Sequence, residues 1–231
     1  MGALLQWEAK RARRVSKQCM RRAAIACLAL GLSACVLNLG DVAGGDRETQ
    51  TRSVDAFDAI AIEGSVDVEA KVGSALSVEV EAAGKVIDKV ETRVEDGTLH
   101  VSLERGVHVN TGRMLVRVTV PKLKSVAVSG SGDASVEGLD EASFSIAVSG
   151  SGDVEAGGEA ESVSISVAGS GDVGARALEV EDADIILRGS GDISVTATET
   201  AKGAIQGSGD VTVHGGADCS IAVAGSGDLN C

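Results

Sequence analysis

Aromatic side chains are nearly missing from this sequence: one Trp, two Phe and no Tyr make up 1% of its 231 residues. Binding sites for sugars and nucleobases usually rely on flat aromatic faces, so the sequence disfavours such sites. A single proline beside 30 glycines without a three-residue period excludes collagen. Lys and Arg number 21 against 34 Asp and Glu, and the resulting net charge of −13 argues against binding to nucleic acid.

A short segment near the N-terminus has the layout of a secretory signal. Arg21 and Arg22 precede an apolar run, Ala23 to Leu32, which is shorter than the roughly 20 residues of a membrane span. The run ends in Leu-Ser-Ala-Cys, which resembles a bacterial lipobox. We therefore predict that residues 1–34 are a signal peptide and that Cys35 carries acyl chains such as palmitate. The alternative is an ordinary signal peptide that ends in cysteine.

The predicted anchor sets the expected location of the protein. Residues 1–19 are longer and more basic than a signal needs, so Met20 is a candidate for the true start. Residues 35–53 read as the lipidated cysteine and a tether. Val36 follows Cys35 where an Asp would retain a lipoprotein in the inner membrane, so we expect the outer membrane. The mature chain would hold 14 basic and 33 acidic residues, a net charge of −19.

The strongest signal in the chain is an internal repeat. The tetrapeptide Gly-Ser-Gly-Asp (GSGD) occurs six times, at spacings of 18 to 20 residues, beginning at Gly130, Gly150, Gly169, Gly189, Gly207 and Gly225. Apolar residues alternate with Ser, Ala or Asp before each motif, as in Phe144, Ile146 and Val148, and this period of two is typical of a strand with one buried face. One repeat is therefore a strand, a tight GSGD turn, a second strand and a looser turn.

Such a unit cannot bury its own apolar face, so the repeats should stack. We predict an all-β fold, a parallel β-superhelix (a solenoid, right-handed by the usual crossover rule) of about 18–20 residues per coil. A six-stranded antiparallel barrel is the competing architecture. Residues 54–129 keep the alternation with less regularity, Gly64-Ser65 looks like a decayed motif, and Asp96-Gly97 suggests a hairpin inserted at 94–103.

Three segments together resemble a known family. They are Val54 to Ile60, Val120 to Leu123, and the GSGD series. The sequence over 54–231 is similar to the putative auto-transporter adhesin, head GIN domain family, and we expect one such domain there. The resemblance implies a β-superhelix with GSG turns between the sheets, and cell adhesion as a proposed role. It brings no set of catalytic residues.

The sequence offers little chemistry for catalysis. No histidine is spaced from a Cys or another His in the way that metal sites require; the three are His100, His108 and His214. The order of residues along the chain also indicates no Ser/His/Asp triad. We therefore expect no enzyme, no metal and no cofactor. Two functions remain: a cell-envelope lipoprotein with a structural or adhesive head, held to the membrane by its lipid and facing an unknown surface partner, or a periplasmic module that binds a ligand or cation. A lytic solenoid enzyme is a distant third.

Two groups of side chains are candidate sites. Cys219 and Cys231 share the inward parity around the last motif, so the sequence suggests a disulfide if the end of the stack tapers; the alternative is two buried thiols. The motif aspartates should form a column on one edge, with equivalent residues about 4.8 Å apart. These are Asp133, Asp153, Asp172, Asp192, Asp210 and Asp228. Capping of backbone N–H groups within each turn should offset their repulsion, and calcium between coils is the alternative.

Overall fold

The computed structural model of the protein describes residues 47–106 and 112–231. The predicted signal peptide, Cys35, residues 36–46 of the tether and His108 lie outside the described residues. In the described part of the chain, no helix is long and apolar enough to cross a membrane.

Most of the described chain is β-strand, and the 3₁₀ turn η1 (Ile87–Lys89) is the one helical turn in the described residues. The strands are β1 (Arg47–Arg52), β2 (Ala59–Gly64), β3 (Asp67–Val72), β4 (Ser77–Ala83), β5 (Val90–Glu95), β6 (Thr98–Leu103), β7 (Leu115–Val120), β8 (Ser125–Gly130), β9 (Ala134–Gly150), β10 (Val154–Gly169), β11 (Val173–Gly189), β12 (Ile193–Gly207), β13 (Val211–His214), β14 (Asp218–Gly225) and β15 (Leu229–Asn230).

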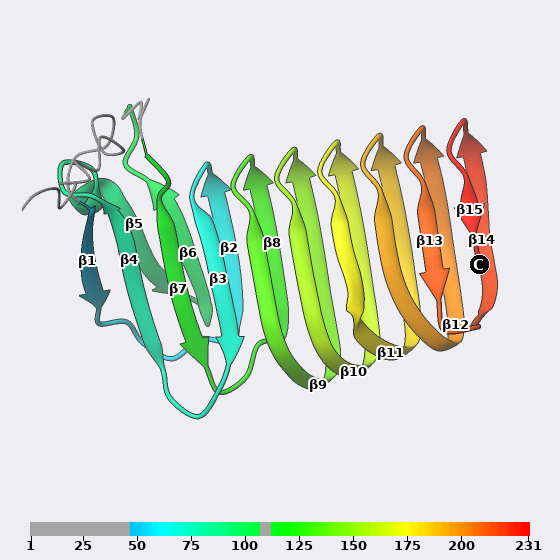
Figure 1. Ribbon diagram of the computed structural model, residues 1–231, viewed down its shortest axis with the longest axis horizontal. Helices are drawn as coiled ribbons and strands as arrows, with labels where there is room; N and C mark the ends of the chain where they lie inside the picture. The colour runs from blue at the N-terminus through cyan, green and yellow to red at the C-terminus, as the bar shows by residue number, and fades with distance from the viewer. Residues whose placement is uncertain (1–46, 107–111) are drawn as a thin grey trace, which may run out of the picture. The chain divides into compact units, whose positions relative to one another are not determined.

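The GSGD repeats form stacked parallel coils (Figure 1). Each of the strands β9 to β12 leaves one GSGD turn along a first face, bends, and returns along a second face to the next turn. Neighbouring strands are parallel and in register, so that Gly150, Gly169 and Gly189 at their ends pair with one another. The predicted parallel solenoid is confirmed, and the antiparallel barrel is wrong.

The looser turn predicted opposite each GSGD motif is present between β13 and β14, where Gly215 and Gly216 lie outside the strands with φ values of 100° and 83°. The prediction is wrong for β9 to β12, where the chain stays in strand conformation around the bend and pairs with the neighbouring coils. Curvature comes from irregularities within the ladder, such as the register shift between Ala156 and Gly158 of β10, where Gly158 has a φ of 135°.

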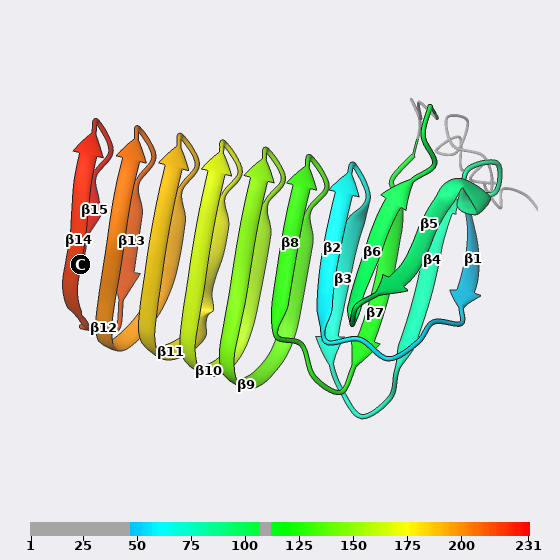
Figure 2. The same cartoon turned by 180° about the vertical axis from the view of Figure 1, so that it is seen from behind.

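The N-terminal coils do not stack in chain order. The coil β2–β3 lies between β6–β7 and β8–β9: β2 pairs with β6 and β8, while β3 pairs with β7 and β9. Between β3 and β7 the chain adds β4 antiparallel to β7 and the hairpin β5–β6. Figure 2 shows β5, β6, β2 and β8 side by side on the second face.

The hairpin and the tether differ from their predicted limits. The turn Asp96-Gly97 has φ values of 49° and 76°, as a tight hairpin requires, but the hairpin spans 90–103 and β6 is a rung of the second face instead of an insertion. Residues 47–52, assigned to the tether, form β1 and pair antiparallel with β4. Their sequence, RETQTR, has no apolar alternation to reveal a strand.

The core lies between the two faces and consists of rows of side chains that repeat from coil to coil. Ile146, Ile165 and Ile185 stack in register and are fully buried. A second row runs from Phe144 through Val163 and Ala183 to Ala201, so its side chains shrink toward the C-terminus. No buried polar or charged residue lies in the described core, which is filled mainly by aliphatic side chains together with Phe57, Phe144 and Met114.

The GSGD glycines are required because the coils approach one another through their backbones at the turn. A Cβ on Gly171 would lie 2.1 Å from the carbonyl oxygen of Gly152 in the preceding coil. The coil β2–β3 carries Gly-Ser-Val-Asp in place of GSGD. Its third position can hold Val66, because the coil on its N-terminal side, β6–β7, has no GSGD motif that this side chain would meet. Here the decayed motif has a structural reason.

Replacement of Gly171 by Ala should therefore destabilise the fold, by about 1–3 kcal/mol or more, because the new methyl group displaces the neighbouring turn. Gly174→Ala is the matched control, since its Cβ would meet nothing closer than 3.6 Å and its φ is ordinary. This control should be neutral or gain about 0.4–1 kcal/mol. Urea unfolding followed by circular dichroism measures both; equal losses would contradict the close-approach argument.

Candidate functional site

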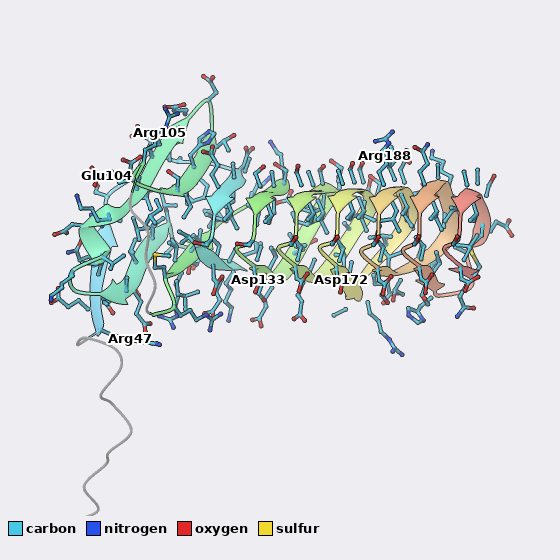
Figure 3. All side chains as sticks on the ribbon, turned by 90° about the horizontal axis from the view of Figure 1, so that it is seen from above. Arg47, Glu104, Arg105, Asp133, Asp172 and Arg188 are labelled. Atoms are coloured by element: carbon cyan, nitrogen blue, oxygen red, sulfur yellow. A yellow bond between two sulfur atoms is a disulfide. The ribbon has the colours of Figure 1, made fainter. Side chains whose placement is uncertain are left out.

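The motif aspartates form a hydrogen-bonded ladder along one edge of the stack. From Asp67 to Asp210, the Oδ1 atom of each carboxylate accepts the backbone N–H of the equivalent Asp in the next coil, at N···O distances of 2.7 to 3.2 Å. Figure 3 looks onto the turns and shows Asp133 and Asp172 on one side of the stack, with Arg188 on the other. The ladder begins at Asp67 of the decayed motif, which the sequence reasoning did not include.

This geometry corrects the prediction that each carboxylate caps its own turn. The acceptor serves the next coil, because stacking places that coil's N–H directly beside the carboxylate. The turn backbones are bonded in the same way: Ser151 and Gly152 both donate N–H groups to the carbonyl of Gly130. Each GSGD turn is therefore held by its neighbours along the stack.

Calcium finds little support in this arrangement. One oxygen of each ladder carboxylate up to Asp210 is already an acceptor, and Ca²⁺ takes six to eight oxygen ligands. Within residues 47–106 and 112–231, no group of three or more His, Cys, Asp or Glu side chains is arranged to hold a metal ion.

The N-terminal part of the first face carries an alternating row of charges. Arg117 of β7 binds Glu81 of β4 through Nη1 at 2.6 Å and Glu69 of β3 through Nε at 3.2 Å. Arg47 extends the row at one end, and Arg113 binds Asp67 at the other. The hydrogen bonds from Arg117 and Arg47 hold the pKa of the Glu81 carboxyl below its usual value, and the bond to Asp67 raises the pKa of Arg113.

A groove of about 690 Å³ lies where this charge row meets the aspartate ladder. Its charged lining residues are Asp67, Glu69, Lys71, Arg113, Arg117, Asp133, Glu137, Asp153 and Glu155. The two arginines lie on the N-terminal side, and the carboxylates continue toward the C-terminal coils. The groove offers charges of both signs to a polar partner.

A second hollow, of about 630 Å³, follows the bends opposite the turns and is strongly acidic. Asp140, Glu159 and Glu179 lie in register on β9, β10 and β11. Glu141, Glu161 and Glu181 add three further carboxylates, and Lys122 is the one base in the lining. This cluster was not identified from the sequence, because irregular bend lengths hide the alignment of its acids.

Two histidines of the described residues lie close to other polar side chains. His214 Nε2 lies 3.2 Å from Ser194 Oγ, yet no carboxylate in the described part is hydrogen-bonded to this histidine to orient it. His100 faces Glu63 at 3.5 Å on the second face, remote from any nucleophile pairing. The Ser194–His214 pair is half-buried, and His100 Nδ1 is buried without a hydrogen-bond partner among the described residues.

The structure contains a disulfide between Cys219 and Cys231, whose Cα atoms are 6.5 Å apart. Facing sheets normally lie about 10 Å apart, so the bridge needs a narrow end. The shrinking inner row and the shorter, 18-residue coils supply that taper. The bridge joins β14 on the second face to the residue that follows β15 on the first.

Comparisons with known proteins agree with this architecture. Residues 56–217 match the model of the family described as putative auto-transporter adhesin, head GIN domain. No curated protein is similar to the chain in sequence. Among solved structures, a putative adhesin from Bacteroides fragilis NCTC 9343 is similar with a TM-score of 0.66 at 20% identity, covering 80% of this chain and 96% of that one. A putative adhesin from Parabacteroides distasonis ATCC 8503 has a TM-score of 0.52 at 20% identity, with coverage of 80% and 97%. At these identities the likeness shows the fold.

Loss of one rung of the aspartate ladder should weaken the stack. Asp172→Ala leaves the N–H of Asp192 without its acceptor, and we expect a loss of about 1 kcal/mol in the free energy of unfolding. Asp172→Asn keeps an acceptor oxygen and removes one negative charge, so it should cost less. Asp184→Ala, on the exposed second face, is the control and should stay within about 0.5 kcal/mol of the parent. If Asn costs as much as Ala, the hydrogen bond does not explain the motif.

Stability should also depend on pH through Glu81. Its pKa is lowered in the folded state, so its contribution is present above the unfolded-state value, about 4.3, and is lost as pH falls through the folded-state value. Glu81→Gln should therefore lower the urea midpoint at pH 7 and match the parent near the acid limit. Glu79→Gln, on the same strand and in no ion pair of the described residues, should show no such convergence. The effect is small because the arginines are half exposed.

Proposed function

The chain belongs to the putative auto-transporter adhesin, head GIN domain family, and on this premise we propose that it is a cell-envelope lipoprotein. Its β-solenoid head is non-catalytic and makes structural or adhesive contacts at the cell surface. The observation that carries this proposal is the combination of family membership with a stack that sets one outward polar side chain of each coil in register with the next.

The second face presents polar side chains in a regular row. One side chain per coil lies in register with the next, through Ser125, Ser145, Ser164, Asp184, Lys202 and Ser220. Rows at the rung spacing of about 4.8 Å give many weak, equivalent contacts, which gain strength when several engage together. Such an array suits a broad partner surface better than a small molecule.

The predicted lipid supports an envelope location. A multiply acylated Cys35 would anchor the head stably, whereas one chain would hold it marginally. Val36 favours the outer membrane as its destination. The domain would then stand on a short tether that leads into β1.

The alternative is a periplasmic module that binds a ligand or cation. The acidic hollow along the bends favours it, because six carboxylates gather there against one lysine. Thermal melts with calcium and with a chelator test this alternative. We expect the melting temperature to stay unchanged, and a calcium-dependent rise that Glu159→Gln with Glu179→Gln abolishes would favour the cation-binding module.

Protease shaving of intact cells, followed by blotting, tests the proposal directly. We expect the head to be digested in intact cells, and intact-mass measurement to find the mature chain beginning at an acylated Cys35. Cys35→Ala should release the head from the membrane fraction. Protection of the head in intact cells but not in lysed cells would refute the surface role and leave the periplasmic one.

Surface attachment provides the functional readout. A deletion strain should adhere less than its parent to abiotic surfaces and to neighbouring cells, and the wild-type gene should restore adhesion. The Cys35→Ala gene should not restore it, because the released head cannot link a partner to the cell. Full adhesion by the deletion strain under all these conditions would contradict an adhesive role.

A further inference from the structure

The C-terminal end of the stack leaves part of its core uncovered. One inner row of the second face runs in register through Val148, Val167, Leu187, Ile205 and Val223. Its first four members are 0–2% exposed, whereas Val223 is 45% exposed. Ile221 and Leu229 of the same coil are half-buried. Val223 differs from the rest of its row because no further coil covers it within the described structure.

The backbone of this end is unpaired as well. Within the described residues, β14 pairs with β12 alone and β15 with β13 alone, so each has one free edge. Natural edge strands are usually blunted by charged side chains. β14 has one charged residue, Asp218, in its eight, and otherwise carries Cys, Ser, Ile, Ala, Val and Gly.

The N-terminal end is protected in the way that the C-terminal end is not. Its edge strand on the first face, β1, reads RETQTR, and that on the second face, β5, carries Glu91, Arg93 and Glu95. Polar antiparallel strands close this end. A head-to-tail stack, with β14 of one molecule on the N-terminal end of the next, would therefore set an apolar row against charged strands.

We propose that the C-terminal end is the interface of a two-fold homodimer, in which β14 pairs antiparallel with β14 of a second copy. A two-fold axis perpendicular to the sheets makes the edge complementary to itself, because each copy supplies the same donors and acceptors in reverse order. Registers that set odd residues opposite odd residues keep Ile221 and Val223 facing the shared core. Both faces then continue from one molecule into the other.

The size of the interface fits this partner. The length of this end is that of the eight residues of β14, at about 3.3 Å each. Its width is that of two sheets about 10 Å apart together with their outer side chains. The product is an area of about 500 Å² per copy. A pair would bury about 1,000 Å², which reaches the lower limit for a specific interface. The disulfide from Cys219 to Cys231 fixes the C-terminal residues to β14, so the edge is ordered before association.

Sedimentation velocity over a range of concentrations tests the dimer. The full chain with Cys35→Ala is used, so that self-association of a lipid does not contribute. We expect a monomer–dimer equilibrium that gives no larger species. Val223→Lys should raise the dimer Kd about tenfold or more, because it places a charge in the shared core. Leu76→Lys is the matched control, since Leu76 is the other exposed large hydrophobic residue among those that the structure describes, at 39%, and should leave the Kd unchanged.

The other outcomes each overturn the proposal. A chain that stays monomeric at every concentration excludes a second copy as the partner. Species that grow beyond two copies indicate head-to-tail stacking. An equal effect of Leu76→Lys places the contact elsewhere. Circular dichroism confirms that both variants fold, and Val223→Thr, which keeps the side-chain shape, should weaken the dimer less than Lys in case the lysine variant is unstable.

Discussion

The close contact between successive GSGD turns sets the geometry of the whole stack. A Cβ atom added to the third-position glycine of any motif would lie about 2 Å from a backbone carbonyl oxygen of the preceding coil. Any larger residue would force the coils apart at this edge and break the hydrogen bonds from Ser and Gly N–H groups to that neighbouring coil. The aspartate ladder occupies the same turns and uses the same spacing. Because the turns set the same spacing between each pair of neighbouring coils, the strands can pair in register along both faces.

With the coil geometry fixed at the turns, the core needs little variety. The space between the two sheets is filled mainly by Val, Ile, Leu and Ala, with Phe57 and Phe144 as the buried aromatic residues of the described chain. Variation occurs where the coil length changes. Phe144 sits in a 20-residue coil, while Ala201 and Gly203 lie in an 18-residue coil near the disulfide. Shorter coils and smaller side chains together produce the taper that brings Cys219 near Cys231.

The regular part of this fold could be predicted from the sequence because each coil repeats the same local signals. Strand alternation, turn glycines and the period of 18–20 residues all describe interactions between equivalent residues. The N-terminal third could not be predicted in the same way. The order β6–β7, β2–β3, β8–β9 depends on which strands find one another in space, and nothing in the alternation of residues 59–120 encodes that order.

Two further differences come from contacts that side-chain patterns do not encode. β1 is a strand through its backbone pairing with β4, so its polar sequence carries no apolar period. The acids along the bends align only after register shifts bring Asp140, Glu159 and Glu179 together, at separations of 19 and 20 residues. The GSGD motif itself was readable, but the direction of its hydrogen bonds, toward the next coil, required the stacked geometry.

The distribution of charge follows from the same stacking. Parallel in-register coils bring identical residues together, so a repeated acid must face its own copies about 4.8 Å away. The motif aspartates meet this constraint by accepting a backbone N–H from the next coil, and the N-terminal face meets it by alternating Arg and Glu across strands. Among the bend acids, Glu141 accepts the backbone N–H of Leu123, and no ion pair of the described residues involves any of the six, so their charges remain open to solvent screening or to a cationic partner. Contacts made by this acidic edge would weaken as salt rises, whereas the apolar association proposed for the C-terminal end would persist at high salt. The two surfaces would therefore differ in their response to salt.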